Sequence, residues 1–160
     1  MVSLVSWARW PAMAAAALFL AGCGAMTAQN PDGKLSPINA IATEEDDHLM
    51  LFGADVVAYF TEGRYVQGQP EYSSQFEGVD FHFSSAEHKA LFDAEPAAYV
   101  PQFGGYCTNG IVFGIPWGGN AQDFLVKDGK LYIFGGELSR KAFMLDFEAN
   151  LALAQKYWDE

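Results

Sequence analysis

Apolar and polar residues alternate between Tyr72 and Phe83, and this pattern predicts two short β-strands. Val79, Phe81 and Phe83 recur at every second position, as expected for a strand that has one face in a hydrophobic core. Glu77-Gly78 lies between the two strands and has a composition typical of a tight turn. The segment is therefore expected to fold as an antiparallel hairpin.

Two further segments have helical patterns. Ser84-Ser85-Ala86-Glu87 forms a capping box with its first Ser at the N-cap, so we expect a helix through Leu91 and Phe92 that ends near Pro96. A longer helix is expected from about Leu138 to Trp158. Its apolar residues fall on one face at helical spacing: Phe143, Phe147, Leu151, Ala154 and Trp158. Such a stripe is typical of core packing rather than of a cofactor site.

Another hairpin is predicted where Phe124–Lys127 and Lys130–Phe134 flank Asp128-Gly129, a strong signal for a type I′ turn. Together, the strands and helices predict one compact α+β domain over residues 49–160, with short antiparallel strands and packed helices. Residues 24–47 lack apolar periodicity and end in an acidic run. We expect residues 23–48 to form a flexible tether before the domain.

The N-terminus contains an unbroken apolar run at positions 12–21, preceded by Arg9, the only charged residue among the first 22. Ten residues rise about 15 Å as a helix, half of the roughly 30 Å needed to cross a bilayer. The run therefore indicates a signal peptide rather than a transmembrane anchor. It ends in Leu20-Ala21-Gly22-Cys23, which resembles the lipobox of bacterial lipoproteins.

The lipobox resemblance implies cleavage before Cys23, a signal peptide at residues 1–22 and a lipid on the Cys23 thiol. Because residue 24 is Gly and not Asp, it further implies anchoring at the periplasmic face of the outer membrane. The alternative is that Cys23 is an incidental small residue in an ordinary secretory signal. From the lipobox resemblance, the first partner that we expect is the membrane, bound through a lipid on Cys23.

Composition and charge exclude several classes of protein. Apolar residues make up 51% of the chain and aromatic residues 15%, which is incompatible with a disordered protein. Nine Lys and Arg residues against 20 Asp and Glu residues give a net charge of −11, and loss of Arg9 with the signal peptide leaves −12. This acidity argues against nucleic-acid binding and disfavours adhesion to anionic lipid. Two cysteines are too few for a disulfide framework or a four-Cys zinc site.

Residues 49–158 resemble the secreted branch of the YHS-domain family, with a lipoprotein signal in front. The family segment Gly-Tyr-Asp-Pro-Val-Ala-Tyr-Phe corresponds to residues 53–60, and two further segments follow in the family's order. The matching residues are Asp55, Tyr59, Phe60, Ser84, Ser85, Gly104, Gly105, Tyr106 and Cys107. The resemblance implies a small α+β fold and a link to metal handling, copper especially.

The heavy-metal-associated relatives carry three cysteines at positions that are Ala58, Ser84 and His88 in this chain. Cys107 is then the only thiol left after lipidation. Four roles remain open for it: a buried structural residue, a metal ligand, a reactive thiol, or one half of an intermolecular disulfide. As a ligand it would need nitrogen from His88 or His82, a donor set that suits copper or zinc. For both histidines, a surface or interface position is favoured over a ligand role.

Three functions follow from these residues. The first is a lipid-anchored periplasmic binding protein that holds copper, zinc or a small ligand near Cys107, His88 and His82. The second is a non-catalytic envelope module that binds a periplasmic protein partner, with Cys107 in a structural role. A thiol-dependent enzyme is less favoured, because the sequence contains none of the common hydrolase, metalloprotease or nucleotide-binding motifs.

Overall fold

A computed structural model of the chain describes residues 40–41 and 48–159, so the predicted signal peptide, Cys23 and most of the tether lie outside the described residues. Four strands form a mixed sheet in the order β1-β2-β4-β3, in which only β2 and β4 are parallel. The strands are β1 (Ala40–Ile41), β2 (Leu49–Met50), β3 (Gln69–Phe76) and β4 (Val79–Phe83). Two residues of the predicted tether thus belong to the sheet as β1.

The β3–β4 hairpin confirms the alternation in the sequence. Val79, Phe81 and Phe83 are buried, while the residues between them on β4 are only partly covered. Glu77 and Gly78 form the turn, with φ of 52° and 79°. Both values lie in the left-handed region that a type I′ turn requires.

The second hairpin separates two hydrophobic clusters. Its strands are β5 (Asn120–Lys127) and β6 (Lys130–Phe134). Leu131 and Ile133 belong to the cluster that covers the four-stranded sheet. Tyr132 and Phe134 belong to the cluster beneath the C-terminal helices. Alternate residues of one strand point to opposite faces, so β6 is shared by both halves of the core.

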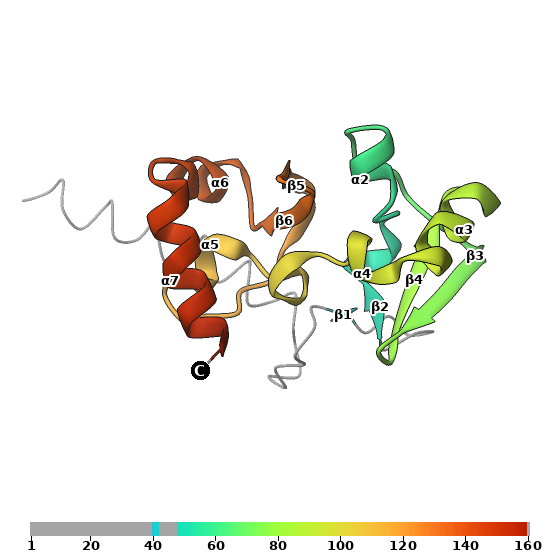
Figure 1. Ribbon diagram of the computed structural model, residues 1–160, viewed down its shortest axis with the longest axis horizontal. Helices are drawn as coiled ribbons and strands as arrows, with labels where there is room; N and C mark the ends of the chain where they lie inside the picture. The colour runs from blue at the N-terminus through green and yellow to red at the C-terminus, as the bar shows by residue number, and fades with distance from the viewer. Residues whose placement is uncertain (1–39, 42–47, 160) are drawn as a thin grey trace, which may run out of the picture.

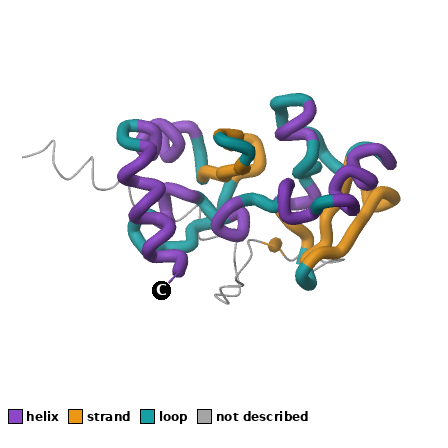
Figure 2. The backbone as a smooth tube through the Cα atoms, viewed as in Figure 1, coloured by secondary structure: helices purple, strands orange, loops and turns teal. Residues whose placement is uncertain are grey.

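Helices flank the hairpin on both sides. The short ones are η1 (Leu51–Gly53), α2 (Ala58–Thr61), α4 (Pro96–Tyr99), η2 (Gln102–Gly105) and α5 (Thr108–Ile111), and the longer ones are α3 (Ala86–Ala94), α6 (Glu137–Met144) and α7 (Phe147–Asp159). Figure 1 shows the sheet with α3 and α4 at one end of the long axis and α5, α6 and α7 at the other. The path of the backbone is simplest to follow in Figure 2. The α+β class predicted from the sequence is confirmed.

Two predictions about helix ends are wrong. The N-cap of α3 is Ser85 rather than Ser84: its backbone is extended, and its hydroxyl accepts from the N–H of His88 at 3.1 Å. The predicted C-terminal helix is interrupted at residues 145–146, because Asp146 starts a new helix by accepting from the N–H of Ala149 at 3.2 Å. Within residues 48–159, no helix is long and apolar enough to cross a membrane.

Candidate functional site

A fully buried carboxylate, that of Asp55, is the centre of the candidate site. Its Oδ1 accepts hydrogen bonds from the backbone N–H groups of Val57 and Ala58, at 3.0 and 3.2 Å. These two bonds satisfy free N–H groups at the start of α2. Asp55 therefore holds α2 in place as well as contributing to the site.

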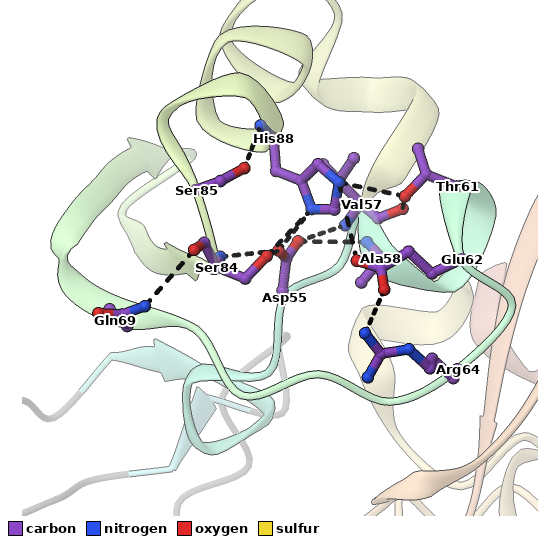
Figure 3. Close-up of polar contacts among 10 residues, drawn as sticks. All are labelled: Asp55, Val57, Ala58, Thr61, Glu62, Arg64, Gln69, Ser84, Ser85 and His88. Atoms are coloured by element: carbon purple, nitrogen blue, oxygen red, sulfur yellow. Dashed lines mark hydrogen bonds and ion pairs between the residues drawn. The ribbon is translucent and has the colours of Figure 1, made fainter.

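The second oxygen, Oδ2, connects α2 to the start of α3 (Figure 3). It accepts from the N–H of Ser84 at 2.8 Å, from the Ser84 hydroxyl at 2.7 Å and from Nδ1 of His88 at 2.7 Å. Burial alone would raise the pKa of Asp55, but the hydrogen bonds from Ser84 and His88, together with the electrostatic attraction of His88, outweigh it and lower the pKa. The carboxyl group is therefore ionised at neutral pH.

Asp55 fixes the orientation of the His88 ring. An ionised carboxylate has no proton to donate, so Nδ1 of His88 must be the donor in the bond between them. In the neutral imidazole, the lone pair then lies on Nε2. Only 12% of the side chain is exposed, and Nε2 lies 3.3 Å from Oγ1 of Thr61 and 4.0 Å from Oε1 of Glu62.

The local sequence explains how α3 delivers this ring. Ser85 caps the helix and places His88 in its first turn, where the ring can reach Asp55. Ser84, the residue before the cap, is left to bind Asp55 with both its N–H and its hydroxyl. The expectation that His88 lies at the surface is wrong, because its imidazole fills the space between α2 and α3 (Figure 3).

Two residues of α2 and the turn after it border the outward edge of His88. Thr61 donates its hydroxyl to the carbonyl of Val57 at 3.1 Å and also faces Nε2. Glu62 forms an ion pair with Arg64 and presents its other oxygen to Nε2. An imidazole oriented by a carboxylate on one nitrogen, with its second nitrogen left to other partners, is the arrangement found in metal-binding histidines and in general bases.

Cys107 lies elsewhere in the molecule. It directly precedes α5, at the opposite end of the long axis from α3 (Figure 1), and its side chain is fully buried. Its Sγ lies 3.1 Å from Oγ of Ser139, and its N–H donates to the carbonyl of Trp117 at 2.8 Å. These surroundings are those of a structural cysteine rather than of an accessible ligand or nucleophile.

The structure does not bring together the three residues predicted as metal ligands. His88 is bound to Asp55 and Cys107 contacts Ser139. His82 is on β4, on the side away from Phe81 and Phe83 as expected, with its ring against Gly53. Among residues 40–41 and 48–159, no group of three or more His, Cys, Asp or Glu side chains is arranged to hold a metal ion.

The other residues of the family resemblance pack the fold together. Tyr59 donates to the carbonyl of Ala121 at 2.7 Å, and burial raises its pKa. Phe60 packs edge-on against Tyr99, with ring centroids 5.4 Å apart. Tyr106 is buried in the C-terminal cluster.

The two glycines before Tyr106 have φ of 59° and 78°. A Cβ at the second of them, Gly105, would lie 3.1 Å from Sδ of Met50, so both backbone conformation and space favour glycine there.

Sequence reasoning did not identify the pairing of Asp55 with His88 or the part played by Thr61 and Glu62. The four-residue spacing of Ser84 and His88 at a helix start was one available signal, since such residues lie on one face. Asp55 is 33 residues from His88, so only the tertiary fold joins them. Comparison of the chain with protein-family models, curated proteins and solved structures gives no match.

Proposed function

We propose that this protein is a lipid-anchored, YHS-like binding protein of the bacterial envelope that holds its ligand at Nε2 of His88. The single observation that supports the proposal is the Asp55–His88 pair, in which a buried ionised carboxylate holds one imidazole nitrogen and leaves Nε2 facing Thr61 and Glu62. The binding point differs from the one expected near Cys107, because Sγ of Cys107 is buried against Ser139.

A borderline metal ion, Zn(II) or Cu(II), suits the donors at this edge, since both accept imidazole nitrogen and carboxylate oxygen. Metal–donor bonds of about 2.0–2.2 Å allow two donors on one ion to lie up to about 4 Å apart. Nε2 of His88 and Oε1 of Glu62 are 4.0 Å apart, and the Glu62 side chain is partly exposed, with its other oxygen paired to Arg64. The ion would keep water in its remaining positions, which implies modest affinity.

Asp55 would support the ion without touching it. A carboxylate on the far nitrogen of a ligating histidine fixes the tautomer and makes the ligating nitrogen more basic. Asp55 already does this for His88. Loss of such an outer partner typically costs 10–100-fold in metal affinity, so Asp55 contributes to binding although it lies behind the ring.

Calorimetric titration of the folded protein with Zn(II) and with Cu(II) tests the proposal. One site is expected in the wild type, none in His88→Ala and a weaker one in Glu62→Gln. The Glu62 variant removes an exposed carboxylate, so it keeps the test valid if His88→Ala fails to fold. His82→Ala is the matched control and should bind like the wild type. Equal binding by the wild type and Glu62→Gln, or no binding at all, would contradict the proposal.

The second candidate, a non-catalytic envelope module with a structural Cys107, is favoured by the burial of that thiol. It makes the opposite prediction for the titration, since no variant would differ from the wild type. A thiol-dependent enzyme receives less support, because a nucleophilic cysteine needs access to its substrate. The titration therefore separates the two leading functions.

A further inference from the structure

Large apolar side chains are exposed together at one end of α7. We call this surface the apolar end; it consists of Phe113, Ile115, Leu153, Tyr157 and Trp158. Phe113 is 63% exposed and Ile115 42% exposed. The Tyr157 ring lies against Gly114, within 3.7 Å of where a Cβ would be, so the loop that carries Phe113 and Ile115 contacts the C-terminal end of α7.

The apolar end lies on the side of the molecule where the chain enters the fold. Viewed down the shortest axis, β1 and the C-terminal end of α7 both lie on the lower side of Figure 1, while α2 lies on the upper side. Only residues 24–39 separate Cys23 from Ala40 in the sequence. At about 3.3–3.6 Å per residue, these span at most about 60 Å, so a lipid on Cys23 keeps the domain within that distance of the bilayer.

The chemistry of the apolar end fits the interface between water and lipid. Trp and Tyr are enriched at this depth because their rings are amphipathic. Lys156 projects its ammonium group over the Tyr157 ring, 5.3 Å from the centroid, and long basic side chains favour the same zone. The net charge of −11 opposes binding to anionic lipid, so a zwitterionic surface is the matching one.

We propose that the apolar end rests in the interface of a zwitterionic bilayer when the protein is anchored. The inference rests on the lipid anchor of the proposed function, but it is independent of the His88 site. Tethering raises the effective concentration of the domain at the membrane, so weak insertion of a few side chains is enough to orient it. Binding of a protein partner to the same surface is the alternative that the experiment must separate.

Tryptophan fluorescence provides the test, because Trp117 and Trp158 are the only tryptophans beyond residue 22. Trp158 is 37% exposed at the apolar end and packs its ring against Phe103 and Tyr106. Trp117 packs near Phe113 with ring centroids 6.4 Å apart. The lipidated full chain is reconstituted into phosphatidylcholine vesicles with or without brominated acyl chains. Brominated lipid should quench the emission, and added phosphatidylglycerol should reduce the quenching.

Two variants make the result specific. The double variant Phe113→Ser, Tyr157→Ser should lose most of the quenching while keeping its thermal unfolding midpoint, since both side chains are exposed. Leu145→Ser is the matched control: it removes an 89%-exposed apolar side chain just before the opposite end of α7 and should be quenched like the wild type.

The outcomes separate the two proposals. Protein that fails to float with the vesicles would overturn the anchor and with it the orientation. Protein that floats but is not quenched, or is quenched equally in the double variant, would overturn the orientation alone. A surface left in water in that way would be available to a protein partner.

Discussion

At the scale of single residues, the carboxylate of Asp55 accepts five hydrogen bonds while fully buried. The donors come from the start of α2, from Ser84, which precedes the cap of α3, and from the first turn of α3. One side chain thus joins two segments that are 29 residues apart in the sequence. Its removal affects both the fold and the tautomer of His88.

Asp55→Asn should lower the free energy of unfolding by about 2–4 kcal/mol at neutral pH. The Asn side chain places an NH₂ group where a carboxylate oxygen accepts hydrogen bonds, so buried donors lose their acceptor. Urea unfolding measures this difference. Asp93→Asn is the control, since that exposed carboxylate contacts only Ser74 and Lys89 at the surface, and it should change stability by less than about 1 kcal/mol.

The stability difference between the wild type and Asp55→Asn should depend on pH. The pKa of Asp55 is lowered by folding, so its stabilisation is complete above the ordinary value and is lost as pH falls through the folded value. The difference in unfolding free energy between the wild type and Asp55→Asn should therefore shrink below about pH 4. A difference that stays constant down to the lowest accessible pH would show that Asp55 is not held ionised by the fold.

The burial of Cys107 predicts its reactivity. Iodoacetamide should modify Cys107 slowly in the folded protein, because Sγ is buried against Ser139. The rate of alkylation should rise with the fraction of unfolded protein. Mass spectrometry with increasing urea measures this, and the fully unfolded chain provides the fast reference rate. Rapid alkylation in native buffer would contradict a structural role and favour the thiol enzyme.

At the scale of elements, the break between α6 and α7 depends on Asp146. Its carboxylate caps α7, and the side-chain amide of Asn150 binds the carbonyl of Phe143 at 2.9 Å. Asp146→Ala should lower stability by about 1 kcal/mol, as measured by thermal or urea unfolding. Asp159→Ala, at the opposite end of α7, is the control and should not destabilise, since a carboxylate there opposes the helix dipole.

Local patterns predicted the hairpins better than the helix ends. Period-two burial in β4 and the turn residues of both hairpins are properties of adjacent residues, so the sequence was sufficient for them. The apolar stripe from Phe143 to Ala154 continues across the break, because both helices pack on the same cluster. Periodicity therefore concealed the interruption, although the capping residue Asp146 was present in the sequence.

The cap of α3 was misplaced by one residue for a tertiary reason. Ser84 and Ser85 are both competent N-caps, and Asp55 binds the first of them. The site was missed for the same reason, because nothing near Asp55 in the sequence indicates its partner on α3. Long-range pairing of polar residues lies beyond what periodicity and spacing describe.

At the scale of the whole molecule, the two ends of the long axis carry different features. The end with the four-stranded sheet and α3 carries the oriented imidazole (Figures 1 and 3). The end with α5 and α7 carries the apolar surface and the buried thiol. The β5–β6 hairpin contributes to both hydrophobic clusters and holds the two ends together.

The proposed function depends on Nε2 of His88 as a binding nitrogen in a ring oriented by Asp55. The most direct measurement is the ¹⁵N NMR spectrum of the imidazoles during addition of Zn(II) to the folded wild-type protein. We predict that Nε2 of His88 shifts towards the value of a metal-bound nitrogen while Nδ1 stays protonated, and that the ring of His82 does not respond. An unchanged His88 spectrum at saturating Zn(II), or equal shifts of His88 and His82, would contradict the account.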